Sequence, residues 1–236
     1  MITRFHADNY IALCDELAAQ DPSLGQIIQQ YGHPPLWSRA AGFATLVHII
    51  LEQQVSLASA MAAYTKLVEK CGQVSPQAVL LLSDADLKSC YFSRQKIVYV
   101  RSLAEAFVSG RIKPESFEER TGEEIRMILK QVKGVGDWTV DVYLIFALHH
   151  ADIFPAGDLA VINAFKLLKG LPVHTSRESI IQTAEAWKPY RSIAAFLLWH
   201  YYIKRRNIRL LPGMYAVTDA VPKTEELLPG GSSSSL

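Results

Sequence analysis

Asp158 is the residue whose type and position most clearly suggest chemistry. It begins the apolar helical segment 158-DLAVINAFKLLKG-170, with no basic residue beside it in sequence. A fixed carboxylate can stabilise a developing positive charge, and it can also orient or deprotonate a water molecule. The same residue can equally be an ordinary helix N-cap, for which aspartate is a favoured type. The residue types alone leave both interpretations open, and the two roles are compatible.

A second candidate site is the turn 134-GVGDW-138, which ends 20 residues before Asp158. Glycine permits positive φ and a close approach of the backbone to another molecule. We expect the amides of Val135, Gly136 and the first turn of the next helix to point outward, where they could bind a phosphate oxygen. A plain turn between two helices has the same pattern, so this turn alone does not distinguish a phosphate-binding site from a structural turn.

Helices must position both sites, because strand-like alternation is almost absent from the sequence. Capping pairs precede several helical segments, namely Ser83 with Asp86, Thr121 with Glu124 and Thr175 with Glu178. The sequence therefore predicts an all-α fold. Its expected helices cover residues 8–20, 23–31, 40–53, 57–71, 76–82, 84–90, 94–109, 122–133, 137–149, 158–169, 176–187 and 190–206.

Composition limits the classes of protein that the chain can belong to. The 236 residues carry a net charge of only +1, although residues 188–209 hold six Lys and Arg and no acid. This basic stretch is either a solvated helix end or a surface that faces phosphates. The sequence lacks an apolar run long enough for a membrane span and a signal peptide, which favours a cytoplasmic protein. Its three cysteines are widely spaced and are expected to be reduced thiols.

Three motifs, in this order along the chain, resemble the helix-hairpin-helix (HhH-GPD) DNA glycosylase superfamily. The segment 43-FATLVHIILEQQVSLASAMAAYTKL-67 resembles its early helix pair, and 130-KQVKGVGDWT-139 resembles its hairpin. The segment 187-WKPYRSIAAFLLWHYY-202 resembles the closing helix of the alkylation-repair branch, that of DNA-3-methyladenine glycosylase II. The likeness covers about residues 36 to 206. It implies a two-lobed helical fold with the active-site cleft between the lobes.

The resemblance also implies roles in DNA binding for particular residues. The hairpin, with Gly134, Val135, Gly136 and Thr139, would bind the DNA backbone. Its carbonyls would hold a sodium or potassium ion, here those of Lys130, Val132 and Val135. Gln54, with Gln53 beside it, would fill the space that a flipped nucleotide leaves in the duplex. Two exposed loop glutamines without this role are the alternative interpretation.

At the catalytic centre, the resemblance places Asp158 against the sugar of the extruded nucleotide. Trp138 and Trp199 match aromatic positions beside that aspartate, and Tyr143 and Tyr202 are candidates for further walls of a base pocket. A cationic alkylated purine gains from stacking on such rings. Trp187, Phe196 and Phe146 are expected in the core. Gly157 stands where relatives often carry a second acid, so the site depends on one carboxylate.

Trp138 also bears on the mechanism. Glycosylases of this superfamily that cut the strand have a lysine at this position, and an indole cannot attack the sugar as an amine. We therefore expect a monofunctional enzyme that uses water. No cysteine follows Cys90, so the family's four-cysteine iron–sulfur cluster is not expected. Catalysis should need no cofactor.

The leading hypothesis is a DNA glycosylase for alkylated purines of the 3-methyladenine and 7-methylguanine type, acting in base-excision repair. Two alternatives remain, namely a glycosylase for uracil, ethenoadenine or hypoxanthine, and a non-catalytic helix-hairpin-helix DNA-binding module. The expected partner is duplex DNA with a damaged base, bound by a monomer at the nucleoid, or in the nucleus of a eukaryote. The expected organisation is an N-terminal helical segment (1–36) packed on the core, a glycosylase domain (37–210) and a flexible C-terminal tail (217–236).

Overall fold

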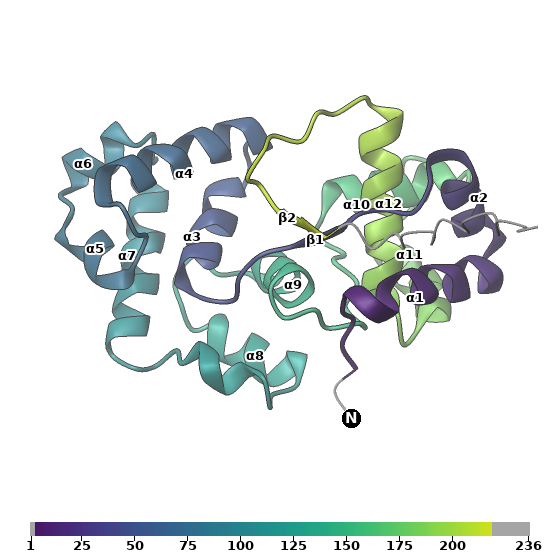
Figure 1. Ribbon diagram of the computed structural model, residues 1–236, viewed down its shortest axis with the longest axis horizontal. Coiled ribbons are helices and arrows are strands. Elements are labelled where there is room, and N and C mark those ends of the chain that lie inside the picture. Colours follow the sequence, from purple (N-terminus) through teal and green to yellow (C-terminus); the bar gives the residue numbers. More distant parts are fainter. Residues whose placement is uncertain (1–2, 219–236) are drawn as a thin grey trace, which may run out of the picture.

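The structure is a computed structural model that describes residues 3–218, and these residues form a mostly helical molecule (Figure 1). The all-α prediction is confirmed. The helices are α1 (Ala7–Gln20), α2 (Pro22–Tyr31), α3 (Phe43–Glu52), α4 (Leu57–Cys71), α5 (Pro76–Leu81), α6 (Asp84–Ser89), α7 (Arg94–Val108), α8 (Gly122–Leu129), α9 (Asp137–Phe146), α10 (Leu159–Leu168), α11 (Arg177–Ala184) and α12 (Arg191–Arg205). Two short 3-10 helices, η1 (Pro114–Phe117) and η2 (Glu185–Trp187), complete the helical elements.

Side-chain caps fix most of the helix starts. Ser83 and Thr121 each form a complete capping box with the acid three residues later. The prediction for α11 was wrong by one residue, because Ser176 rather than Thr175 accepts the amide of Ser179. Two predicted helices were too long at their C-terminal ends. α8 ends at Leu129, and α9 ends at Phe146.

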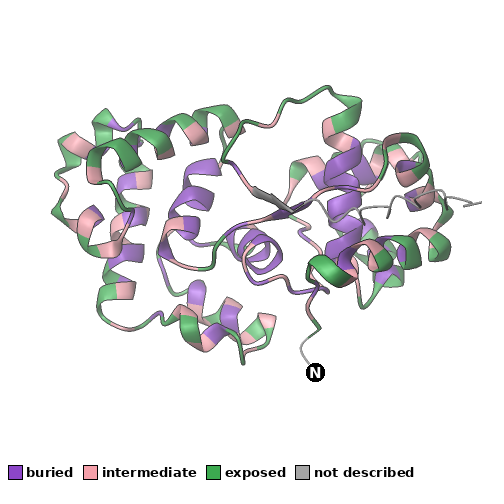
Figure 2. Ribbon diagram, viewed as in Figure 1, coloured by how far each residue is buried: buried purple, intermediate pink, exposed green. Residues whose placement is uncertain are grey.

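The helices pack in two groups, as the two-lobed prediction requires. In Figure 1, α3 to α7 lie on one side, and α1, α2, α10, α11 and α12 lie on the other. The two innermost helices, α9 and α12, are buried over most of their length (Figure 2). Their sequences are apolar on nearly every side, which is the pattern of a helix enclosed by others. Between them they carry Trp138 and Trp199.

The N-terminal segment packs on the core. The rings of Phe5 and Tyr10 meet Phe196 of α12 edge-on, with centroids 5.5 and 5.4 Å away. Arg4 donates hydrogen bonds to the carbonyls of Leu148 and Phe117. The first helices therefore belong to the same lobe as α12. Within residues 3–218, every helix is too short or too polar to cross a bilayer.

A small two-stranded sheet was not predicted. Strand β1 (Leu36–Ser38) pairs in antiparallel register with β2 (Ala216–Thr218), so that Trp37 lies opposite Val217. Residues 217 and 218 are thus part of a strand and not of the tail to which the sequence assigned them. The remainder of that tail, 219–236, lies outside the described residues. The pairing brings the segment after α12 back toward the middle of the molecule (Figure 1).

Candidate active site

The Asp158 carboxylate is held by four N–H donors at the N-terminus of α10. Its Oδ1 accepts the amides of Ala160 and Val161, both at 3.0 Å, and the indole N–H of Trp199 at 3.1 Å. Its Oδ2 accepts the indole N–H of Trp138 at 2.9 Å. The cap and the proposed catalytic group are therefore one residue. A carboxylate fixed in this way keeps its orientation and its charge in one place, as a preorganised electrostatic site requires.

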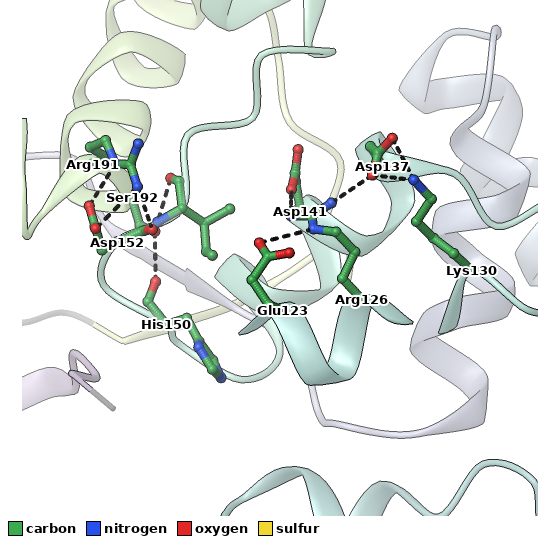
Figure 3. Close-up of polar contacts among 10 residues, drawn as sticks. Glu123, Arg126, Lys130, Asp137, Asp141, His150, Asp152, Arg191 and Ser192 are labelled. Carbon is green, nitrogen blue, oxygen red and sulfur yellow. Dashed lines mark hydrogen bonds and ion pairs between the residues drawn. The ribbon is translucent and has the colours of Figure 1, made fainter. Parts of the chain in front are cut away.

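The loop that carries Asp158 is fastened to the start of α12. Arg191 forms two hydrogen bonds to the Asp152 carboxylate, at 2.7 and 3.1 Å, and a third at 2.6 Å to Glu185. The Ser192 hydroxyl donates to the carbonyl of His150 and accepts the amide of Ile153 (Figure 3). Arg191 therefore supports the loop that leads to Asp158.

Gly157 packs directly against Trp138. A Cβ at Gly157 would lie 3.3 Å from the Cβ of Trp138, which is tighter than most carbon contacts. This contact gives a steric reason for the missing second acid at this position. The site accordingly offers one carboxylate flanked by two indoles.

The hairpin joins α8 to α9 and is braced by ion pairs. Arg126 of α8 contacts Asp137 at 3.0 Å and Asp141 at 2.5 Å, and Lys130 contacts Asp137 at 2.8 Å (Figure 3). Burial raises the pKa of Asp141 to about 6, although Arg126 opposes the rise. These pairs fix the angle between the two helices, and hence the position of the turn.

The turn itself differs in detail from the prediction. Gly134 has φ +90°, but Gly136 is extended with φ −104°. The Val135 amide donates to the carbonyl of Val132 at 3.1 Å, so it does not point outward. Gly136 caps α9 without a side chain that accepts the first amides of the helix. The exposed start of α9 is therefore the part of the hairpin that suits a phosphate.

Gln53 joins the hairpin to the loop after α3. Its Nε2 donates to the Gly134 carbonyl and to the Thr139 hydroxyl, both at 2.9 Å. Thr139 is only 1% exposed, so its predicted direct contact with DNA is wrong: its hydroxyl serves this internal link. The two predicted DNA-binding loops are thus connected to each other.

Gln54 lies next to this link and points into solvent. It is exposed and has φ +58°, a conformation that non-glycine residues rarely adopt. Ser56 accepts the amide of Ser59 and caps α4. An exposed side chain at the tip of a tightly held turn has the geometry of a residue that inserts into a duplex.

The two candidate tyrosines have different surroundings. Tyr143 is fully buried, and its hydroxyl accepts the amide of Gly42, so it is a core residue and its prediction as a pocket wall was wrong. Tyr202 lines a groove between α10 and α12, where Arg206 stacks on its ring at 4.8 Å. Trp187, Phe196 and Phe146 are buried, as predicted.

Sequence reasoning missed a second group of residues beside the site. Tyr215 lies with its ring centroid 5.1 Å from that of Phe146, which in turn is 4.9 Å from Trp199. The Arg39 guanidinium stacks on Tyr215 at 4.4 Å and forms hydrogen bonds of 2.6 and 3.0 Å with Glu52. The only sequence signal for this group was the pair of opposite charges, Arg39 and Glu52, which lie 13 residues apart in an apolar stretch.

The basic stretch is partly neutralised. Lys188 pairs with Glu185, and Arg191 pairs with Asp152 and Glu185. Among the described side chains, the remaining cations of this stretch form no ion pair with an acid. These are Lys204, Arg205, Arg206 and Arg209.

Comparison with known proteins gives a consistent result. The model of the HhH-GPD superfamily of base excision DNA repair proteins matches residues 47–189. DNA-3-methyladenine glycosylase 1 of Schizosaccharomyces pombe is 33% identical over 161 residues, which are 66% of this chain and 71% of that protein.

Solved structures agree with this assignment. The S. pombe 3-methyladenine DNA glycosylase Mag1, in complex with abasic DNA, superposes with a TM-score of 0.71 at 28% identity, over 81% of this chain and 95% of that one. A DNA-3-methyladenine glycosidase from Bacillus halodurans gives 0.72 at 28% identity, over 88% and 95%. From its motifs, its fold and these matches, the chain belongs to the HhH-GPD superfamily of base excision DNA repair proteins.

Proposed function

We propose that the protein is a monofunctional DNA glycosylase that hydrolyses the N-glycosidic bond of alkylated purines in base-excision repair. The observation that carries this proposal is the Asp158 carboxylate, fixed by the indoles of Trp138 and Trp199 at the N-terminus of α10. The relatives support the substrate class, because those reported above are named for 3-methyladenine. We expect the protein to act as a monomer on damaged duplex DNA, at the nucleoid or in a nucleus.

The chemistry follows from one fixed negative charge. When the bond between C1′ and the base breaks, the sugar becomes positively charged, and a carboxylate beside it stabilises that charge. The same carboxylate can orient the attacking water. Alkylated purines are cationic and electron-poor, so they leave without a strong acid. A site with a single carboxylate and no second acid at Gly157 suits such leaving groups.

Two observations support a mechanism without strand cleavage. Trp138 stands at the position where strand-cutting relatives have a lysine. Its indole N–H donates a hydrogen bond to the Asp158 carboxylate. Of the two lysines at the hairpin, Lys130 is paired with Asp137, and Lys133 is exposed at the turn. We infer that water is the nucleophile and that no Schiff base forms with the sugar.

We also propose a structural sodium or potassium ion at the hairpin. The Val132 carbonyl already accepts the Val135 amide but has a second lone pair. The backbone amides of the described turn leave the carbonyls of Lys130 and Val135 unused. Carbonyl oxygens of this kind suit a hard monovalent cation, which would add positive charge beside a DNA phosphate. We propose no cofactor for catalysis.

The decisive experiment compares wild-type protein with Asp158→Asn on methylated duplex DNA. Chromatography of the released bases should show free 3-methyladenine with the wild-type protein. The variant should release it at least ~100-fold more slowly and still bind DNA, since loss of one preorganised electrostatic group typically costs that much. A variant as fast as wild type would refute the assignment of Asp158.

Two further measurements use the same protein. Borohydride should trap no covalent complex with damaged DNA, whereas a trapped complex would show an amine nucleophile. A panel of duplexes with single uracil, ethenoadenine or hypoxanthine lesions separates the proposed substrate class from the other glycosylase activities. Release of no base from any of these substrates would favour a DNA-binding module instead.

A further inference from the structure

The segment that follows α12 returns toward the active site, and its Tyr215 lies immediately before β2, beside Phe146. Two interactions hold the backbone, one immediately before Tyr215 and one immediately after it. Arg39 donates from Nε to the Met214 carbonyl at 3.2 Å, and β2 begins at Ala216 with its pairing to Ser38. Because the backbone is fixed immediately before and after it, Tyr215 is a positioned residue.

The surroundings of the Tyr215 ring are aromatic and charged. Phe146 and Trp37 lie near it, with centroids at 5.1 and 6.2 Å, and the Arg39 guanidinium covers one face at 4.4 Å. Arg39 and Glu52 are both buried and paired with each other, so the charge beneath the ring is compensated. A planar group is therefore presented on a rigid, nearly neutral support.

Tyr215 is linked to Asp158 and to Glu52 through its ring neighbours. Phe146 lies 4.9 Å from Trp199, whose indole donates to Asp158, and Arg39 is paired with Glu52. Burial raises the pKa of this phenol well above its ordinary value, and the charges of Glu52 and Asp158 add to the rise while Arg39 opposes it. The group is thus an un-ionised hydroxyl at neutral pH, able to donate a hydrogen bond. Asp158 marks the sugar side of the site, and Glu52 immediately precedes the Gln53–Gln54 loop. The ring neighbours of Tyr215 reach both of these parts of the site, Phe146 toward Trp199 and Arg39 toward Glu52.

We propose that Tyr215 is a specificity-determining wall of the base pocket, held in place by the Arg39–Glu52 pair. This inference rests on the proposed glycosylase function and adds a residue from outside the stretch that carries the family motifs. Its ring would contact the face or edge of the flipped purine, and its hydroxyl would meet a polar substituent on that purine. The wall would therefore distinguish purines that differ in their exocyclic groups.

The test uses the ratio of two products from one reaction. Methylated duplex DNA contains both 3-methyladenine and 7-methylguanine, which differ in the groups that a pocket wall would meet. We expect Tyr215→Ala to change the ratio of the two initial release rates by about threefold or more, because an aromatic contact made by one base more than the other is lost. A variant that is merely less well folded releases both bases more slowly and leaves the ratio unchanged.

Tyr215→Phe identifies the part of the side chain that acts. A ratio close to the wild-type value assigns the discrimination to the ring, and a ratio that moves with that of Tyr215→Ala assigns it to the hydroxyl. Tyr91→Ala serves as a matched control, since Tyr91 is 65% exposed on the loop before α7, and it should keep the wild-type ratio.

The inference is overturned if both Tyr215 variants keep the wild-type ratio, or if Tyr91→Ala shifts it equally. Should Tyr215→Ala fail to fold, Tyr215→Leu keeps the apolar volume and tests the same loss of the aromatic face. Wild-type protein that releases neither base refutes the proposed function itself. The two failures are therefore distinguishable in one set of reactions.

Discussion

Removal of the indole N–H at position 138 tests whether the orientation of the carboxylate limits the reaction. Trp138→Phe keeps an aromatic ring for stacking and removes the donor to Oδ2 of Asp158, which lies at 2.9 Å. Oδ2 accepts only this hydrogen bond from the described residues, whereas Oδ1 accepts three. The variant should therefore leave the cap on α10 intact and free the other oxygen.

The size of the effect follows from the geometry. A hydrogen bond to a charged group contributes about 1.5–3 kcal/mol, and about 1.4 kcal/mol corresponds to a factor of ten in rate. Trp138 is half-buried, so water can replace part of the lost interaction. We therefore expect excision to slow by about tenfold. Trp199→Phe makes the same chemical change at Oδ1, where two amides remain, and should slow excision by no more than about threefold.

Single-turnover excision of 3-methyladenine with enzyme in excess measures this difference without a contribution from DNA affinity. Thermal unfolding of both variants shows how much of each effect comes from stability. The reasoning fails if Trp138→Phe excises as fast as wild type, or if Trp199→Phe is the slower variant at equal stability.

Two further predictions concern stability. Gly134→Ala should lower the free energy of unfolding by about 2 kcal/mol or more in urea titration, because a Cβ there would lie 2.1 Å from the ring of Tyr99 and φ is +90°. An unchanged urea midpoint would contradict this prediction. Adding Tyr99→Ala to the Gly134→Ala chain should recover the part of the loss that comes from the steric clash. His48 is buried against Tyr64, and burial together with the Arg39 charge lowers its pKa to about 4, although Glu52 opposes the change. Because the folded-state pKa lies below the unfolded value of about 6.5, its contribution is present above pH 6.5 and is lost as the pH falls toward 4. The stability of His48→Phe should therefore fall by roughly 2–3 kcal/mol less than that of wild type between pH 7 and 4.5, and parallel curves would show that His48 does not contribute.

Local sequence signals were sufficient for most of the helices. Ser83 and Thr121 give complete capping boxes, and glycines mark several helix ends, so the predicted boundaries fall within a few residues of those observed. The end of α8 was overestimated, because residues 130–133 keep a helical composition while the hairpin requires them to turn. Such turns depend on the packing of two helices and not on the composition of one.

The site was only partly visible in the sequence. The resemblance placed Trp138 and Trp199 beside Asp158, but residue types could not show that both indoles donate to its two oxygens. Tyr143 was misassigned because the direction of one side chain on an apolar helix cannot be read from spacing when all of its faces are buried. Tyr215 reaches the site through a three-residue strand pairing between segments about 180 residues apart, which has no local pattern.

The link from Gln53 to Gly134 and Thr139 has a mechanical consequence. Because it joins the loop that carries Gln54 to the hairpin, it holds the two proposed DNA-binding loops at a set spacing. If both loops bind DNA as proposed, a set spacing on the protein side would leave most of the bending and unstacking to the double helix. A base pair weakened by damage deforms at a lower energetic cost than an intact one. Such a set spacing would give a first selection among sites, made before any base enters the pocket.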